Sequence, residues 1–143
     1  MSTAEIKGNN ALVVDDNEST RALVAKILEQ ELGVRSVLAG TCEEALRLAE
    51  AREFDVILLD LLMPGIGGFE VLRHIRMASA NMQTPVVILS VLDDKDSVDR
   101  CMALKAHAFV TKPVNRNILA GIVKAQLPNG PRSSYSGSRP RGS

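Results

Sequence analysis

Three carboxylates, one hydroxyl and one ammonium each follow a short apolar run in this 143-residue sequence. Asp15 and Asp16 close the run "ALVVDD", and Asp60 closes "DVILLD". Ser90 and Lys112 stand at the ends of "VVILS" and "AFVTK". Carboxylate oxygens are hard ligands that suit Mg²⁺, an ion that keeps several waters and shares its coordination shell with phosphates. If the five groups meet, they form a site for a divalent cation and a phosphate.

Five strands that alternate with helices are predicted to position these groups. The strands are short, partly β-branched runs that we expect to be buried on both faces: Ala11–Val14, Val34–Ala39, Val56–Leu59, Val86–Leu89 and Ala108–Val110. Parallel neighbours need crossover connections, and these place helices on both faces of the sheet. The sequence therefore predicts an α/β fold, a flavodoxin-like doubly wound sandwich with five parallel strands and five helices. In such a sheet the functional crevice lies beyond the carboxyl ends of the strands.

Apolar residues at helical spacing predict the helices between the strands. Examples are Leu23, Ile27 and Leu28 in the first helix, Val98 and Met102 in the fourth, and Ile118, Ile122 and Val123 in the fifth. Gly33 is predicted to end the first helix. Thr41 and Glu44 are predicted to open the second helix with a capping box.

Length and composition predict one folded domain, residues 9–127, between an N-terminal extension (1–8) and a disordered tail or linker (128–143). No apolar run approaches the ~18 residues that a membrane span needs. The N-terminus also lacks the pattern of a secretory signal, so we expect a cytoplasmic protein. Residues 1–99 carry a net charge of −8 and residues 100–143 one of +8, which indicates an acidic site in the first part.

Each of the five residues also has a structural explanation when it is considered alone. Asp15 or Asp16 could cap the helix that follows the first strand. Asp60 could be an acid at a loop entry, Ser90 a hydroxyl at a helix N-terminus, and Lys112 a surface charge. The coincidence of all five at equivalent strand ends favours a functional site.

Four separated motifs, "VVDDNEST", "DVILLDLLMPGIGGFEVLRHIR", "VVILSVLDD" and "AFVTKPV", resemble in order and spacing the receiver domain of two-component response regulators. The resemblance covers residues 9–127. It implies that Asp60 is the phosphoacceptor. It also implies a Mg²⁺ ion bound by Asp16, by Asp60 and by the backbone carbonyl of Leu62, with Asp15 holding the ion through water.

The resemblance further implies how the site responds to phosphorylation. Ser90 and Lys112 would receive the phosphoryl oxygens, Phe109 would be the aromatic switch residue, and the Lys112–Pro113 bond would be cis. The response would reshape the face made by the fourth helix, the fifth strand and the fifth helix. The expected partners are a sensor histidine kinase or phosphotransfer protein, an output domain or downstream protein on that face, and a second copy in a phosphorylation-dependent dimer. The domain would be a phosphoacceptor rather than an enzyme, without direct binding to nucleic acid or membrane.

Four residues depart from the usual pattern of the family. Gly67 stands where an acid is usual, which predicts a looser loop. Val91 stands where a smaller residue is usual, and its stiff side chain is expected to restrict the inward rotation of Phe109. Leu62 and Leu92 are apolar where the family often has polar residues, and they should flank the path of water to the acyl phosphate.

Three other functions are alternatives to that of a receiver domain. A hydrolase of the haloacid dehalogenase type needs a second Asp two residues after the nucleophile, where this chain has Leu62. A flavin or nucleotide binder of similar fold needs a Gly-rich loop after the first strand, where this chain has "DDNEST". A phosphorylation-independent pseudo-receiver, acting as a protein-binding module, usually lacks a pocket acid or the lysine, and this chain retains all of them.

Overall fold

The computed structural model describes residues 9–78 and 80–127. The predicted N-terminal extension (1–8) and the predicted tail (128–143) lie outside the described residues. Within this part of the chain, no helix combines the length and apolar character that crossing a membrane requires.

Strands and helices alternate strictly along the described residues. The strands are β2 (Asn10–Val14), β3 (Arg35–Ala39), β4 (Val56–Asp60), β5 (Val86–Ser90) and β6 (Ala108–Thr111). The helices are α1 (Glu18–Leu32), α2 (Cys42–Ala51), α3 (Gly68–Ala78), α4 (Lys95–Ala103) and α5 (Arg116–Gln126). Each strand begins and ends within one residue of its predicted bounds, because turn residues and polar side chains border every apolar run.

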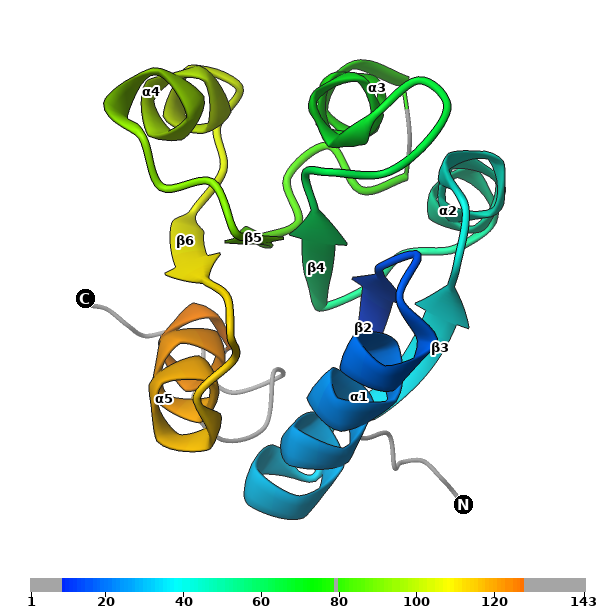
Figure 1. Cartoon of the computed structure of the whole chain (residues 1–143). Helices are drawn as coiled ribbons and strands as arrows, with labels where there is room; N and C mark the ends of the chain where they lie inside the picture. Colours follow the sequence, from blue (N-terminus) through cyan, green and yellow to red (C-terminus); the bar gives the residue numbers. More distant parts are fainter. Residues whose placement is uncertain (1–8, 79, 128–143) are drawn as a thin grey trace, which may run out of the picture.

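The five strands form one parallel sheet in the order β3-β2-β4-β5-β6. Figure 1 shows α2, α3 and α4 along one face of this sheet and α1 and α5 along the other. The predicted doubly wound fold is therefore confirmed. From β2 the chain first adds β3 on one side and then returns to add β4 on the other, so the winding reverses between β2 and β4. This reversal marks the crevice where α/β sheets bind their ligands.

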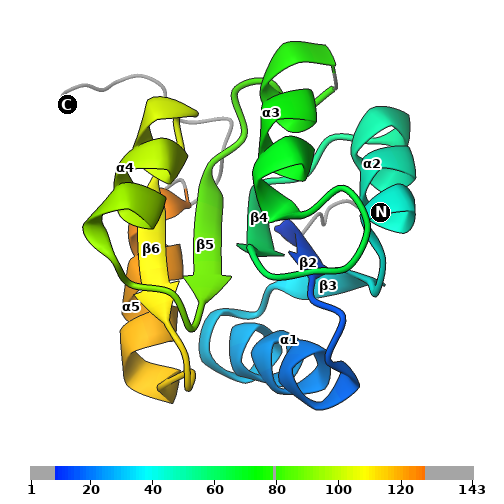
Figure 2. The same cartoon turned by 45° about the horizontal axis from the view of Figure 1, so that its top comes forward.

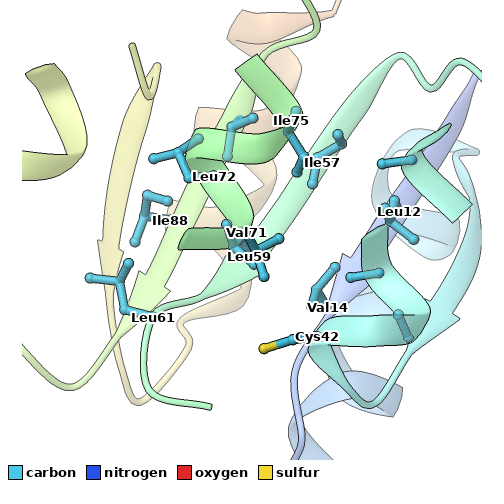
Figure 3. Packing of buried hydrophobic residues seen from close by; sticks show 14 of the residues in the cluster. Leu12, Val14, Cys42, Ile57, Leu59, Leu61, Val71, Leu72, Ile75 and Ile88 are labelled. Carbon is cyan, nitrogen blue, oxygen red and sulfur yellow. The ribbon is translucent and has the colours of Figure 1, made fainter. Parts of the chain in front are cut away.

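Alternate residues of each strand enter two hydrophobic clusters, one under each layer of helices. On β2, Leu12 and Val14 face the cluster under α2, α3 and α4, whereas Ala11 and Val13 face the cluster under α1 and α5. Figure 3 shows the first cluster, in which side chains of α3 meet those of the central strands; its labelled residues include Ile57, Leu59, Val71, Leu72, Ile75 and Ile88. Close packing in these two hydrophobic clusters fixes the positions of the strands, and thereby the positions of the groups at their ends.

Burial on both faces holds for the central strands but is wrong for the two edge strands, β3 and β6. In β6 only Val110 is buried. All residues of β4 and β5 are buried. In β3, which pairs only with β2, Arg35 and Leu38 are exposed, and only Ala39 is buried. The apolar run at 34–39 thus belongs to an edge strand, where one side of the backbone has no neighbouring strand.

The predicted helix boundaries are also borne out where capping residues mark them. Gly33 ends α1 with a left-handed backbone (φ 66°), the conformation in which glycine is least strained. The side chain of Thr41 accepts a hydrogen bond from the backbone N–H of Glu44 at the start of α2. The Glu44 carboxylate accepts its hydrogen bond from the N–H of Gly40, one residue before the position that a standard capping box uses.

Candidate functional site

The five groups predicted from the strand ends lie along one edge of the sheet. An oxygen of Asp15, one of Asp16 and one of Asp60 all lie within 4.8 Å of one another, because β2 and β4 are paired neighbours. Ser90 ends the next strand, β5, and its carbonyl accepts a 2.7 Å hydrogen bond from the N–H of Lys112. Figure 2 shows β5 and β6 running toward this same edge. The site thus occupies the crevice where the winding of the sheet reverses.

Lys112 links two of the three acids. Its Nζ lies 2.8 Å from Oδ2 of Asp15 and 3.4 Å from Oδ2 of Asp60, and its side chain is only 16% exposed. Burial acts to lower the pKa of the Lys112 ammonium, but the hydrogen bond to Asp15 and the charges of both acids outweigh it, and the pKa is raised. Lys112 is therefore a cationic part of the site and not a surface charge.

Asp60 is a buried carboxylate under opposing influences. Burial raises the pKa of its carboxyl group, and the charge of Asp15 raises it further. The charge of Lys112 and the N–H of Leu62, which donates to Oδ1 of Asp60 at 3.2 Å, act in the other direction. The net effect is a raised pKa. The ionised carboxylate of Asp60 is therefore destabilised in the protein, and a bound cation beside it would stabilise that form.

The two adjacent acids differ in burial and in partners. Asp15 is fully buried, and both of its carboxylate oxygens are engaged. Oδ1 accepts from the N–H of Asn17 at 2.9 Å, and Oδ2 contacts Lys112. Asp16 is exposed. Neither acid caps α1, because the side chain of Asn17 accepts the capping hydrogen bond from the N–H of Thr20.

Ser90 is fully buried at the end of β5. Its hydroxyl oxygen accepts a 2.9 Å hydrogen bond from the N–H of Leu92. The explanation of Ser90 as a helix N-terminal hydroxyl is wrong, since Asp94 caps α4. Phe109 is half-buried and packs against the cluster under α2, α3 and α4. The peptide bond between Lys112 and Pro113 is cis.

Exposed and half-buried apolar side chains stand in the loops that follow β4 and β5. Leu62 is 49% exposed and Val91 60% exposed, while Leu92 is half-buried. Ile66, which was not predicted from the sequence, is as exposed as Leu62 and lies in the same loop between β4 and α3. The signal was available, since Ile66 is the one large apolar residue within "PGIGG". Of these residues, Leu62 and Leu92 are the two whose backbone N–H groups contact the site, at Asp60 and Ser90.

Two glycines shape the loop that carries Leu62. Gly67 has φ of +86°, a backbone region that side chains other than glycine rarely adopt, so its backbone conformation favours glycine whatever the capping requirement. A methyl group on Gly68 would come within 2.5 Å of the carbonyl oxygen of Asp60 and of the Cα of Leu61. The loop can therefore fold back against the end of β4 only because residue 68 has no side chain. The looseness predicted for this loop remains a prediction.

The donor set suits a divalent cation that prefers oxygen. Three carboxylates converge, two of them buried, and among the described residues Lys112 is the one cation that pairs with the buried two. Like charges at such distances disfavour one another's ionised form, so the cluster gains from additional positive charge. Carboxylate and carbonyl oxygens with room for water are the ligands that Mg²⁺ takes in proteins.

The combination of fold and site defines a class of protein. A doubly wound parallel sheet that gathers an acid triad, a hydroxyl and a lysine at its switch point is typical of the receiver domains of two-component signalling. Residues 11–124 match the family described as "Response regulator receiver domain". The chain belongs to this family.

Three relatives illustrate the range of similarity. The chain is 33% identical over 131 residues to the response regulator UvrY of Escherichia coli, and the alignment covers 91% of this chain and 56% of UvrY. The solved structure of the chemotaxis protein CheY4 of Vibrio cholerae is 31% identical, with a TM-score of 0.79, and covers 85% of this chain and 100% of CheY4. The receiver domain of the sensor histidine kinase PA1611 of Pseudomonas aeruginosa is 26% identical, with a TM-score of 0.75, and covers 84% of this chain and 98% of that one. That domain holds a magnesium ion in its active-site cleft.

The relatives differ in overall organisation. They include response regulators as well as sensor kinases. This chain spans only about half the length of UvrY. The shared part is the receiver domain, and the activity of each whole protein comes to this chain only as a proposal.

Proposed function

We propose that Asp60 accepts a phosphoryl group from a phosphohistidine on a sensor histidine kinase or a phosphotransfer protein. The observation that carries this proposal is the placement of a buried Asp60 carboxylate 3.4 Å from Lys112 and within a cluster of three acids. Asp60 is the member of this cluster that lies at the end of the central strand β4. As a phosphoacceptor in signalling, the domain assists its own phosphorylation but acts on no separate substrate.

Asp16, Asp60 and the backbone carbonyl of Leu62 would hold Mg²⁺ directly, and Asp15 would hold it through water. The exposure of Asp16 supports this division, since both carboxylate oxygens of Asp15 already have partners in the protein. The magnesium ion in the cleft of the PA1611 receiver domain also supports it. When bound, Mg²⁺ would neutralise charge between the acceptor carboxylate and the incoming phosphoryl group.

In the transfer step, a carboxylate oxygen of Asp60 attacks phosphorus. The bond between phosphorus and the imidazole nitrogen of the donor breaks, and its electron pair stays on that nitrogen. The product is an acyl phosphate on Asp60. Lys112 and Ser90 stabilise the equatorial phosphoryl oxygens, and this positioning of charge is the main contribution a protein makes to phosphoryl transfer.

The phosphorylated form would signal through the face made by α4, β6 and α5. Ser90 moves its hydroxyl from the N–H of Leu92 toward the new anion, and Phe109 turns inward into the space that opens. A downstream protein, an output domain or a second copy of the chain would read the altered face. We place the domain in the cytoplasm, where histidine kinases present their phosphoryl groups, and we expect no direct contact with nucleic acid or membrane.

Phosphorylation with a small donor tests the proposal. Acetyl phosphate with Mg²⁺ should add one phosphoryl group, stable in acid and labile in base, and intact-mass spectrometry should detect it. Asp60→Asn should abolish the labelling, and Asp16→Ala should weaken Mg²⁺ binding more than Asp15→Ala. Equal labelling of the Asp60→Asn variant would refute the assignment of the acceptor. Absence of labelling in the parent would instead favour the pseudo-receiver that acts only by binding proteins.

A further inference from the structure

Arg21, on the first turns of α1, makes a contact beside the acid cluster that the proposed phosphoryl transfer does not use. Its Nη1 donates a 2.7 Å hydrogen bond to the backbone carbonyl of Asp15. That carbonyl belongs to the peptide unit that joins Asp15 to Asp16. Because a peptide unit is planar, holding its carbonyl also fixes the direction in which the chain enters Asp16.

The backbone of Asp15 is held on both sides. Its N–H donates to the carbonyl of Ala39 at 3.1 Å, and its carbonyl accepts from Arg21. Both peptide units that flank Asp15 are thus tied to neighbouring elements. The exposed side chain of Asp16 depends on this backbone for its orientation toward the cluster.

Gly40 makes room for the guanidinium. A methyl group on Gly40 would lie 2.8 Å from Nη1 of Arg21 and 3.4 Å from its Cζ. Real side chains do not approach so closely, so an alanine at residue 40 would displace the guanidinium from its place over the Asp15 carbonyl. The hydrogen bond of Arg21 therefore depends on the absence of a side chain at Gly40, which lies in the loop between β3 and α2.

We infer that Arg21, seated against Gly40, is a positioning residue that orients the Asp15–Asp16 peptide and so prepares Asp16 to bind Mg²⁺. The inference rests on the proposed function, because it assumes the metal site. Residues that hold metal ligands in place commonly contribute tenfold or more to metal affinity. Arg21 does so through the backbone, and its planar guanidinium can direct an N–H at a carbonyl with little freedom.

The sign of one measurement separates this role from a plain charge effect. A cationic side chain beside an acid cluster repels Mg²⁺, so charge alone predicts that Arg21→Met binds the ion more tightly. Positioning predicts the opposite. We expect the Arg21→Met variant to bind Mg²⁺ about tenfold more weakly. The Arg21→Lys variant should lose less, since an ammonium can still donate to the carbonyl.

Gly40→Ala provides a second, charge-neutral test. The clash involves the far end of a flexible side chain, so the variant should fold while the guanidinium moves away. Its Mg²⁺ affinity should fall, and adding Arg21→Met should lower it little further, because both changes remove one contact. Lys26→Met, a cation removed from the exposed side of the same helix, is the control for charge, and Gly121→Ala is the control for a glycine substitution.

The measurements are calorimetric titration with Mg²⁺ alone and thermal unfolding in chelator. Weaker Mg²⁺ binding in both Arg21→Met and Gly40→Ala, with both controls unchanged, supports the inference. Binding by Arg21→Met as tight as that of the parent, or tighter, overturns the inference and leaves the proposed function intact. If Arg21→Met fails to fold, unchanged affinity in Gly40→Ala overturns it equally. A parent chain that does not bind Mg²⁺ overturns the proposed metal site, and this inference with it.

Discussion

The carboxyl group of Asp60 holds its proton more tightly than that of an ordinary aspartate, because burial and the charge of Asp15 raise its pKa. A folded-state pKa above the unfolded value of 3.8 means that the folded protein binds this proton more tightly than the unfolded chain. The stability that this preference contributes is complete below the unfolded pKa. It is lost as the pH rises through the folded pKa, so at neutral pH the ionised Asp60 weakens the metal-free protein.

Asp60→Asn should therefore raise the thermal midpoint of the metal-free protein at pH 7 by a few degrees. The gain should shrink as the pH is lowered toward 3.8, the unfolded pKa. Lys112 keeps its 2.8 Å contact with Asp15, so the substitution leaves no unpaired ammonium. Unfolding scans in chelator across this range measure the effect, and Asp93→Asn, at an exposed acid, controls for net charge. A midpoint below that of the parent at pH 7 would contradict the cause assigned to the raised pKa.

We propose that Leu62 and Leu92 flank the path of water to an acyl phosphate on Asp60. The N–H of Leu62 donates to Oδ1 of Asp60, and the N–H of Leu92 donates to the hydroxyl of Ser90, so both residues contact groups that we propose to receive the phosphoryl group. Apolar side chains at these positions exclude water and cannot orient it. The phosphorylated state should therefore be long-lived.

The variant Leu62→Asn with Leu92→Glu should lose its phosphoryl group several-fold faster than the parent. Because the two side chains flank one water position, their effects need not add. The measurement is loss of the label over time in excess Mg²⁺ after the donor is removed. Ile66→Asn, at an equally exposed residue of the same loop, should leave the rate unchanged. A double variant that keeps its phosphate as long as the parent would show that the lifetime is set elsewhere.

At the scale of elements, the loop between β4 and α3 depends on a close approach of backbone to backbone at Gly68. A methyl group there would meet the backbone of Asp60 and Leu61, and neither can move without disturbing β4. Gly68→Ala should cost about 1–3 kcal/mol of unfolding free energy, the usual range for overpacking. It should also weaken Mg²⁺ binding, because the displaced loop carries the Leu62 carbonyl.

Gly121 in α5 is the matched control for this substitution. A methyl group on Gly121 meets nothing within 4 Å, and the residue lies on the exposed side of a helix. Gly121→Ala should therefore stabilise the protein by about 0.5–1 kcal/mol through helix propensity. Urea denaturation of the Gly68→Ala and Gly121→Ala variants measures the two changes in the free energy of unfolding. Equal effects of the same sign would show that the space around Gly68 is not what requires glycine there.

The strand ends could be predicted from sequence, because apolar runs with polar borders locate them and parallel topology brings them to one edge. Asp60 and Lys112 are positioned in this way. Contacts that depend on the path of a long side chain could not be predicted, and Arg21 reaching across Gly40 is one of them. Nothing in the spacing of the sequence indicates that a guanidinium on α1 meets the carbonyl of Asp15.

Helix faces were predicted less well than strand ends. Leu23 and Ile118, chosen for helical spacing, are exposed, and their neighbours Val24 and Leu119 are buried. Met102 is likewise exposed beside the buried Cys101. In α1 and α5 the buried residue is one position after the one predicted, and in α4 it is one position before. Packing against the sheet determines which side of each helix is covered, and hydrophobicity alone does not distinguish two adjacent apolar residues.

At the scale of the whole molecule, we propose that residues 9–127 form the complete folded unit. α5 ends at Gln126, and Leu127 still packs against the cluster under α1 and α5. A chain that ends after Leu127 should therefore keep its free energy of unfolding within ~0.5 kcal/mol and its rate of phosphorylation. Val123→Ala, at a buried residue of α5, should lower stability measurably and shows that the assay is sensitive. A loss of more than ~1 kcal/mol on truncation would place the domain boundary further along the chain.

Asp15 and Lys112 form one ion pair although 97 residues separate them in the chain. During synthesis, all three acids leave the ribosome well before β6 exists. A nascent chain that has reached only β5 holds the acid cluster without its ammonium, and such distant contacts form late in folding. The complete site therefore forms only after β6 has been synthesised, and a chain that stops before β6 lacks the ammonium that pairs with Asp15 and Asp60.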